Sequence, residues 1–162
     1  MKIREAEPRD FPVIRELLTS MWELHKNREP DFIIKNWQNF DVTKYLDCSR
    51  ELSTEKNSAY VAIIDEKVAG VMTVQIREIS SFFKETKILY VDDLSVAKNF
   101  QHRGVGTALL KFAEDLAKEN DIKWLKSRVY EFNESMQSLN EKFGYKKLYS
   151  AWFKEVNKKE EK

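Results

Sequence analysis

At 162 residues the chain is long enough for one domain with a continuous core and short for two. Its 28 Lys and Arg residues and 27 Asp and Glu residues give a formal net charge of +1, and both signs are mixed along the chain. This balance argues against a dedicated nucleic-acid-binding protein. Cys48 is the only cysteine, which excludes an internal disulfide, and the sequence has no Cys/His cluster that would form a structural metal site.

The sequence contains no targeting or membrane-spanning signal. Its first ten residues hold no apolar run of signal-peptide length, and no stretch approaches the roughly 20 apolar residues of a membrane span. We therefore expect a cytoplasmic protein. With no repeat and no low-complexity stretch before the charged end, we expect one domain over residues 1–156 and a solvated tail over residues 157–162.

The N-terminal third predicts a short strand followed by two helices. The strand runs from Lys2 to Ala6, after which two prolines and Asp10 supply the start signals of a helix. Apolar residues recur along this helix at helical spacing: Phe11, Ile14, Leu18 and Met21. The pattern from Asn27 to Phe40 is irregular and aromatic, and a second helix is expected from about Val42 to Leu52.

The middle of the chain predicts three antiparallel strands. Ser58–Ile64 and Val68–Ile79 are rich in β-branched and aromatic residues, and the three charged residues between them suit a tight turn. A third such run, Lys87–Val96, follows the polar and aromatic connection Ser80–Thr86. We expect the first two runs to form a hairpin and all three to form a meander.

The last third predicts two helices and two extended segments. The longer helix spans Gly104 to Asn120, with one apolar face formed by Val105, Leu109, Phe112, Ala113 and Leu116. A strand over Ile122–Tyr130 and a short helix over Asn133–Phe143 follow, and Gly144 ends that helix. Tyr145–Val156 is the final extended segment. The expected order is β, α, α, β, β, β, α, β, α, β.

The segment from Val91 to Thr107 joins an apolar strand to the long helix through a short polar turn. The first N–H groups of a helix lack internal partners and lie at its positive end, so this junction suits an anion such as a pyrophosphate. Glycine at Gly104 and Gly106 leaves the main chain open to phosphate oxygens. A Rossmann site would need a third glycine where Leu109 stands, and a Walker A loop would need Gly-Lys-Ser/Thr. A purely structural turn is the alternative.

The stretch DDLSVAKNFQHRGVGTALL resembles the acetyl-CoA motif of GNAT N-acetyltransferases, because Gln101, Gly104 and Gly106 match the family pattern Gln/Arg-x-x-Gly-x-Gly/Ala. A second stretch, NESMQSLNEKFGY from Asn133 to Tyr145, resembles the second cofactor segment of the family, Asn-x-x-Ala-x-x-Phe-Tyr-x-x-x-Gly-Phe. Strand, turn and helix also agree with the family in order and spacing. The resemblance covers essentially residues 1–156.

The resemblance implies an α/β fold: a mixed, mostly antiparallel central sheet flanked by helices, with one parallel pair of strands that splay apart. This pair is the strand ending at Val96 and the strand Ile122–Tyr130, and the pantetheine arm of acetyl-CoA enters between them. Leu94 and Val96 would pair with the arm through their main chain. Asn133 would bind the arm and also cap the helix that follows it. The implied cofactor-binding residues are Leu94, Ser95, Val96, Gln101, His102, Arg103, Gly104, Val105, Gly106, Thr107, Asn133 and Met136.

The implied activity is that of an N-acetyltransferase, which moves an acetyl group from acetyl-CoA to a primary amine of a small molecule or peptide by direct attack in a ternary complex. Asp92 matches by position an acidic residue that acts as the base, often through water, in some relatives. Adjacent strand residues point to opposite faces, so we expect Asp92 to face the cleft and Asp93 the other side. Alternatively, Asp92 only orients the substrate or binds its positive charge. A main-chain N–H near Leu94 is the expected donor to the thioester oxygen.

Asn140 is a departure from the family pattern. Many relatives have at this position a tyrosine that protonates the departing thiolate, whereas an amide has no acidic proton to give near neutral pH. Asn140 can still donate a hydrogen bond to the sulfur. Tyr130 and Tyr149 are the candidates to replace the missing acid.

The acceptor is the least specified part of the sequence. Relatives contact it through the first two helices, the loop between them and the final strands, and the ring-bearing residues there are either core or acceptor contacts: Trp22, His25, Trp37, Phe40, Tyr45, Phe82, Phe83 and Trp152. We expect His25 to pack or lie at the surface rather than act as a base. No nucleic-acid or membrane partner is expected, and the apolar segment Leu148–Phe153 either pairs across a homodimer interface or completes the sheet within one chain. The alternative function is an acetyl-CoA-binding sensor with weak or no transferase activity.

Overall fold

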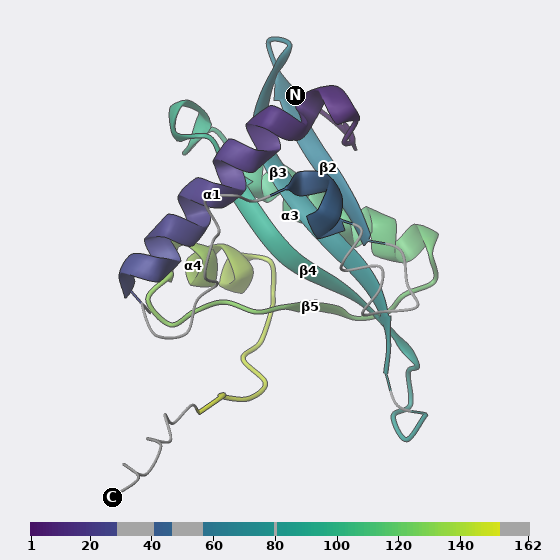
Figure 1. The fold of residues 1–162 in the computed structure, drawn as a ribbon. Helices are drawn as coiled ribbons and strands as arrows, with labels where there is room; N and C mark the ends of the chain where they lie inside the picture. The colour runs from purple at the N-terminus through teal and green to yellow at the C-terminus, as the bar shows by residue number, and fades with distance from the viewer. Residues whose placement is uncertain (29–40, 47–56, 80, 153–162) are drawn as a thin grey trace, which may run out of the picture.

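A five-stranded sheet forms the centre of the protein (Figure 1). The structure is a computed structural model, and it describes residues 1–28, 41–46, 57–79 and 81–152. The elements are β1 (Lys2–Glu5), the short 3-10 helix η1 (Pro8–Asp10), α1 (Phe11–Arg28), β2 (Asn57–Ile64), β3 (Lys67–Glu78), β4 (Lys87–Val96), the 3-10 helix η3 (Lys98–Phe100), α3 (Val105–Glu119), β5 (Leu125–Ser127) and α4 (Glu134–Lys142). Each expected strand and helix that falls wholly within the described ranges is present, with ends shifted by a few residues.

The strands lie in the order β1-β2-β3-β4-β5. The first three neighbouring pairs are antiparallel, which confirms the predicted hairpin and meander, and β5 runs parallel to β4. The predicted mixed α/β sheet with one parallel pair is therefore confirmed. No helix within the described ranges is long and apolar enough to cross a membrane.

The helices cover the two faces of the sheet, with α1 in front and α3 behind in Figure 1. The core under α1 contains Ile14, Leu17, Leu18, Trp22, Val42, Val61 and Val71. The core under α3 is larger and contains Ala62, Ala69, Met72, Val74, Leu89, Val91, Val105, Leu109, Leu110, Ala113, Ala117 and Ile122. The first turn of α3 lies so close to the sheet that a Cβ on Gly70 would come within 2.9 Å of Val105 Cγ1. Gly70 thus allows the start of α3, and the turn before it, to lie against β3 and β4.

A partly buried ion pair ties β1 to η1, directly before α1. Two nitrogens of the Arg4 guanidinium donate to the two oxygens of Asp10, at 2.6 and 2.9 Å. The carboxylate also accepts from the main-chain N–H of Glu7 at 2.8 Å. The hydrogen bond from Arg4, the largest effect, lowers the pKa of Asp10 against the opposing effect of burial. The start signal read at Asp10 in the sequence therefore acts through a contact with the preceding strand.

Two regions differ from the prediction. The strand expected over Ile122–Tyr130 is only three residues long, Leu125–Ser127, because the chain turns away from β4 after Ser127. The final segment is in no strand over residues 145–152, because no described strand lies beside it to accept its hydrogen bonds. Its side chains of Leu148 and Trp152 are instead 87% and 93% exposed.

Several predictions fall partly or wholly outside the described residues. The second helix is seen only over residues 42–46, where the Asp41 carboxylate accepts from the N–H of Thr43 at 2.9 Å and caps the first turn. Residues 47–52 of that prediction, the aromatic segment up to Phe40, and the domain end at residue 156 with its charged tail all lie outside the described ranges.

Candidate active site

A β-bulge in β4 places two adjacent carboxylates on one face of the sheet. Thr73 of β3 pairs with Asp93, and the next residue, Val74, pairs with Val91, so that Asp92 is the extra residue. The bulge breaks the alternation of side chains along the strand, and both aspartates lie on the face that α1 covers. The expectation that Asp93 faces the other side is therefore wrong. Both carboxylates line one cavity.

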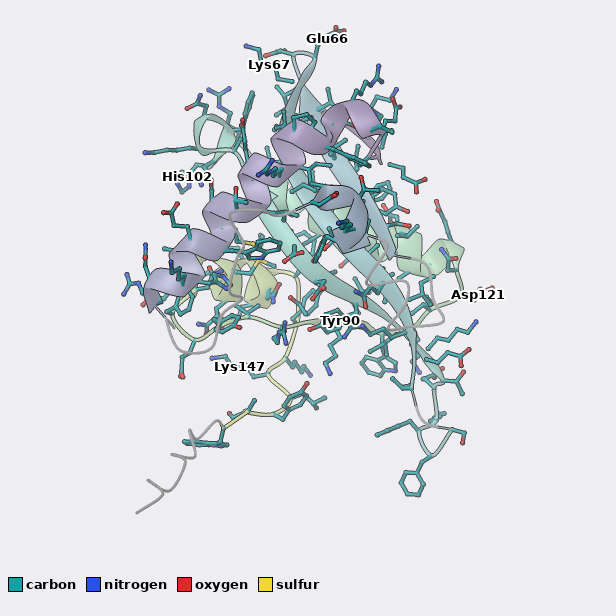
Figure 2. All side chains as sticks on the ribbon, viewed as in Figure 1. Glu66, Lys67, Tyr90, His102, Asp121 and Lys147 are labelled. Atoms are coloured by element: carbon teal, nitrogen blue, oxygen red, sulfur yellow. The ribbon has the colours of Figure 1, made fainter. Side chains whose placement is uncertain are left out.

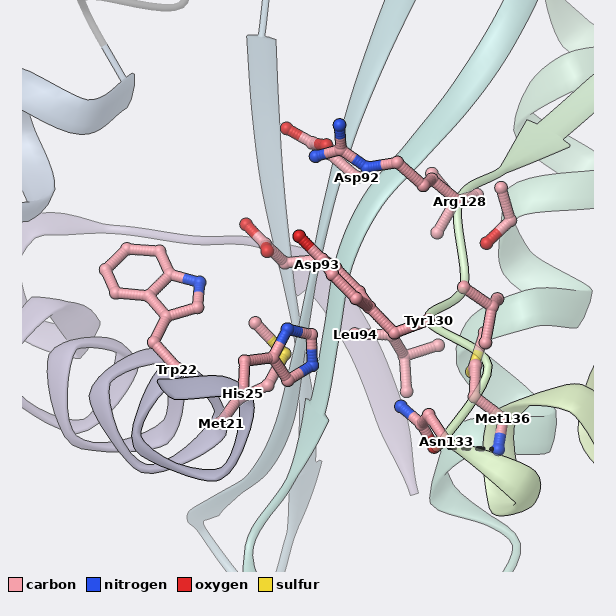
Figure 3. Close-up of a pocket in the computed structure, with 13 residues that line it drawn as sticks. Met21, Trp22, His25, Asp92, Asp93, Leu94, Arg128, Tyr130, Asn133 and Met136 are labelled. Atoms are coloured by element: carbon pink, nitrogen blue, oxygen red, sulfur yellow. Dashed lines mark hydrogen bonds between the residues drawn. The ribbon is translucent and has the colours of Figure 1, made fainter. Parts of the chain in front are cut away.

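This cavity opens where β4 and β5 separate. Their pairing ends at Val91 and Ser127, and beyond this point the two chains form opposite walls of a cavity of about 250 Å³. Figure 3 shows α1 and α4 closing it from two sides. The walls are Asp92, Asp93 and Leu94 from β4, and Arg128, Val129 and Tyr130 after β5, with Met21, Trp22 and His25 from α1 and Asn133 and Met136 from the start of α4. The predicted splaying of the parallel pair is thus confirmed.

Asp93 is held by hydroxyl and indole donors. The Tyr45 hydroxyl donates to Asp93 Oδ2, and Thr73 Oγ1 donates to the same oxygen at 3.1 Å. The Trp22 side chain also forms a hydrogen bond with the carboxylate. Burial and the negative charge of Asp92 raise the pKa of Asp93 to about 6, against the lowering effect of these donors. Asp93 is therefore a fixed carboxylate that exchanges its proton close to neutral pH.

Sequence reasoning missed this network because its members come from four separate elements. Trp22 and Tyr45 were candidate acceptor contacts, and their edge-to-face rings, 5.7 Å apart, instead support the carboxylate of Asp93. A pair of adjacent aspartates in a strand was the available signal. Two adjacent strand residues share a face only if a bulge lies at that point, and a bulge depends on the register between two strands.

The polar turn before α3 leaves its main chain open. Gly104 has φ 78°, in the left-handed region that favours glycine, and a Cβ built there would meet nothing within 4 Å. The first intrahelical bond runs from the N–H of Ala108 to the carbonyl of Gly104, so the three N–H groups before it have no partner within the helix. This is the geometry of an anion site at a helix N-terminus.

The other residues of the turn have different environments. Gln101, His102, Arg103 and Thr107 are exposed, whereas Val105 is 1% exposed and can offer only its main chain. A Cβ on Gly106 would come within 3.2 Å of Leu139 Cδ2, so this glycine also lets α3 approach α4. The two glycines that looked equivalent in the sequence therefore differ: Gly104 is open to solvent, and Gly106 is at a helix contact.

The β4 edge beside the cavity is free beyond residue 91, since the described part of β5 pairs only with Leu89, Tyr90 and Val91. Leu94 lines the cavity, and Val96 packs against the core under α3. The Ser95 hydroxyl donates to the carbonyl of Leu17 at 3.0 Å, so its side chain ties β4 to α1. Leu94 and Val96 alternate with Ser95 along the free edge, where the Val96 carbonyl accepts from Gln101 Nε2 at 3.4 Å.

Asn133 caps α4 as predicted. Its Oδ1 accepts from the N–H of Met136 at 3.1 Å, and both side chains line the cavity. The cap and the cavity wall therefore involve the same residue, as the sequence suggested.

Comparisons with known proteins agree with this geometry. A family model described as the acetyltransferase (GNAT) family matches residues 11–145. The chain belongs to this family. A curated relative, the uncharacterized N-acetyltransferase in the pepI 3′ region of Lactobacillus delbrueckii subsp. lactis, is 29% identical over 90 residues. That match covers 54% of this chain and 51% of the relative, so the chain spans about half the length of the curated relative that it matches.

Solved structures of GNAT-like fold resemble the whole described domain. A mutant of the BH1408 protein from Bacillus halodurans has a TM-score of 0.83 and 19% identity, and the match covers 97% of this chain and 100% of that one. The aminoglycoside N-acetyltransferase AAC(6′)-Iy in complex with CoA has a TM-score of 0.70 and 15% identity, with coverage of 96% and 93%. These likenesses concern the fold. Together with the family match, they confirm the resemblance read from the two sequence motifs.

Asn140, the GNAT residue that departs from the family pattern, is on α4 and is not among the residues that line the cavity. Its Oδ1 is buried and has no hydrogen-bond partner among the described residues. The hydroxyl of Tyr145 is in the same situation, and burial raises the pKa of Tyr145 to about 12. Of the two phenols weighed as replacements for the family tyrosine, Tyr130 lines the cavity, whereas Tyr149 is 66% exposed.

His25, one of the ring-bearing candidates of the sequence, also lines the cavity. Its ring lies 4.7 Å from that of Tyr130 and 5.2 Å from that of Phe132, so it packs as expected. Burial and the positive charge of Arg128 lower the pKa of His25, which favours the neutral ring.

The remaining ring-bearing candidates are either exposed and away from the cavity or outside the described residues. Phe82 and Trp152 are each 93% exposed and do not line the cavity. Phe83 is 60% exposed and is also absent from the cavity wall. Trp37 and Phe40 lie outside the described residues.

Proposed function

We propose that this GNAT protein transfers an acetyl group from acetyl-CoA to a primary amine of a small molecule or peptide, by direct attack in a ternary complex. The observation that carries the proposal is the pair of carboxylates at the point where β4 and β5 separate. A module that only binds acetyl-CoA has no need for charged groups at that point. The solved relative in complex with CoA supports a coenzyme A thioester as the donor.

The residues present fit acetyl-CoA at two places. The open space at Gly104 and the free N–H groups of the first turn of α3 suit a pyrophosphate, with the exposed Arg103 beside them. The free edge of β4 at Leu94 and Val96 suits the amide groups of the pantetheine arm, which would extend the sheet as an added strand does. Acetyl-CoA supplies an activated thioester. The remaining chemistry is that of the side chains around the cavity.

Asp92 is the proposed base, either in direct contact with the acceptor amine or through water. An amine in water near pH 7 is mostly protonated, so it must lose a proton before it attacks. Two carboxylates in one cavity favour the entry of an ammonium ion. Asp93, ionised above its pKa of about 6, adds a fixed negative charge next to Asp92. A main-chain N–H near Leu94 is the proposed donor to the thioester oxygen.

The departing thiolate has two proposed partners. Tyr130 is proposed as the group that protonates the sulfur, supported by the place of its ring in the cavity wall. Asn140 is proposed as a hydrogen-bond donor to the sulfur, supported by its match to the tyrosine position of the family. A coenzyme A thiol is a good leaving group, so a hydrogen bond to the sulfur reduces the need for a strong acid.

The test is release of free thiol from acetyl-CoA with a panel of polyamines, aminoglycosides, amino acids and peptides. We expect turnover with at least one amine. Asp92→Asn should lower kcat/KM by about 10² to 10⁴, the usual contribution of a general base. Asp121→Asn, which makes the same change at an exposed aspartate far from the cavity, should leave it unchanged. CoA binding without turnover on any amine would refute transfer and leave the sensor function in its place.

A further inference from the structure

Three cationic side chains lie beside the two carboxylates on the same face of the sheet. Tyr90 of β4 pairs with Gln75 of β3 and with Lys126 of β5. Side chains of paired residues share a face, and so do residues two apart along a strand, which places Arg77 with Gln75. Arg128 lies two residues after Lys126 and lines the cavity itself. We refer to Arg77, Lys126 and Arg128 as the cationic cluster.

Two members of the cationic cluster, Arg77 and Lys126, lie near the ring of Tyr90. The guanidinium carbon of Arg77 is 3.6 Å from the ring centroid, and its Nε donates to Gln75 Oε1 at 2.6 Å. Lys126 Nζ is 6.0 Å from the same centroid and 5.0 Å from the ring centroid of Tyr149. Burial raises the pKa of Tyr90, as does the negative charge of Asp92, and the positive charges of all three members of the cluster oppose these effects. The three cations therefore lie within electrostatic reach of a single hydroxyl group.

The cluster has no counter-charge within ion-pair distance in the part of the chain that the structure describes. The ion pairs there join other residues, for example Arg4 with Asp10 and Lys123 with Glu85. Gln75, which is 7% exposed, satisfies one nitrogen of Arg77 and leaves the other two guanidinium nitrogens available. Three neighbouring cations that form no ion pair with the described carboxylates favour an anionic ligand, because a bound anion would relieve their mutual repulsion.

The position of the cluster excludes the pyrophosphate of the donor as that anion. Tyr90 precedes Val96 by six residues, which is about 20 Å along a strand, and the glycine turn lies beyond Val96. Figure 2 shows Tyr90 well separated from His102 of the turn. Leu89 and Val91 pack in the core under α3, so that the Tyr90 side chain between them faces the α1 side. The cluster therefore lies on the α1 face of the sheet, and Arg128 is the member that lines the cavity.

We propose that the acceptor carries an anionic group, a carboxylate or a phosphate, which the cationic cluster binds while the acceptor amine lies at Asp92 and Asp93. This inference rests on the function proposed above. A guanidinium group can donate two parallel hydrogen bonds to two oxygens of a carboxylate or phosphate. Such a bidentate contact would also orient the amine toward the donor. A polycation such as an aminoglycoside would instead bring ammonium groups against the cluster.

The distance between the two carboxylates and the cationic cluster limits the length of the acceptor. Asp93 pairs with Thr73 and Tyr90 with Gln75, two residues away along β3, so the carboxylates at the bulge lie about 7 Å from Tyr90 along the strand. The amine and the anion are therefore separated by several bonds, as in an ω-amino acid or the side chain of a basic amino acid, rather than by the single carbon of an α-amino acid.

The test compares kcat/KM for acceptors that differ only in the group at the far end. Six-carbon compounds with a terminal amine are used, in which the other end is a carboxylate, a phosphate, a hydroxyl or a second amine, together with shorter amino carboxylates. We expect the best anionic acceptor to exceed the amino alcohol by about 10- to 100-fold, as expected for charge-assisted hydrogen bonds, and the diamine by more. The carboxylate and phosphate arms decide which anion is bound.

Variants of the cluster test the same interaction from the side of the protein. Arg77→Gln and Lys126→Gln should each lower the ratio of kcat/KM for the anionic acceptor to that for the amino alcohol, by about 10- to 100-fold. Lys123→Gln is the matched control, since Lys123 is an exposed lysine that pairs with Glu85 at 3.4 Å, and it should keep the ratio. CoA affinity, measured by calorimetry, reports that each variant is folded.

The outcomes separate this inference from the proposed function. The inference is overturned if kcat/KM for the amino alcohol or the diamine equals that for the anionic acceptor, or if Arg77→Gln leaves the ratio unchanged. The proposed acetyltransferase function is unaffected by either result. If no amine is acetylated, the proposed function fails. Calorimetry of the six-carbon amino carboxylate with the CoA-loaded protein then decides the inference: binding that is lost in Arg77→Gln supports it, and absent or unaltered binding overturns it.

Discussion

Asp93→Asn tests the buried carboxylate at the bulge through the pH dependence of stability. The folded protein raises the pKa of Asp93 from 3.8 to about 6. Between these values the folded state binds a proton that the unfolded chain has released, so stability falls as the pH rises through this window. A pKa difference of about 2 at 1.36 kcal/mol per pH unit amounts to about 3 kcal/mol, of which about 2 kcal/mol falls between pH 4 and pH 7.

The asparagine variant has no proton to exchange at this position. Its free energy of unfolding, relative to that of the unsubstituted protein, should therefore rise by about 2 kcal/mol from pH 4 to pH 7. Changes in the hydrogen bonds to Tyr45 and Thr73 add a constant that does not depend on pH, so the test concerns only the slope. Urea denaturation at four pH values measures it, with Asp121→Asn as the exposed control. If the free energy of unfolding of the variant relative to the unsubstituted protein stays constant or falls as the pH rises, the burial of a charge at Asp93 is refuted.

Two further substitutions address the donor side. Gly104→Val places a side chain in the open space at the turn and should weaken CoA binding by roughly tenfold or more, because it blocks the approach of an anion to the helix N-terminus. Gly144→Val is the control, because Gly144 has nearly the same φ, 77° against 78°, and equally open space. It carries the same backbone strain but should leave the CoA affinity measured by calorimetry unchanged. Equal losses of affinity in the two variants would contradict CoA binding at the turn before α3. Asn140→Leu removes a buried oxygen that has no partner among the described residues, and should stabilise the fold by about 1 kcal/mol while lowering kcat. Denaturation and thiol release check the two effects, and a loss of stability would show that the amide has a structural partner.

The sequence by itself determined the order of elements from β1 to β4 and from α3 to α4, and the glycine turn before α3, because both depend on local chemistry. Helical spacing of apolar residues predicted α1 and α3, and runs of β-branched residues predicted the meander. Gly104 was identifiable because a left-handed φ at a helix start requires glycine. Asn133 was identifiable as a cap because its side chain bonds an N–H only three residues away. Such contacts are encoded within a few neighbouring positions.

Only the tertiary structure decided how the cavity around Asp92 and Asp93 is built, because its contacts join residues that are distant in the sequence. Alternation along β4 predicted opposite faces for Asp92 and Asp93, and the register between β3 and β4 placed both on one face. Asp93 meets Tyr45 across 48 positions, and no local pattern contains that pairing. The cationic cluster likewise forms only because Tyr90 pairs with β3 on one side and with β5 on the other. Strand register is set by the packing of the whole sheet, which is why the glycine turn is readable in the sequence and the network around Asp93 is not.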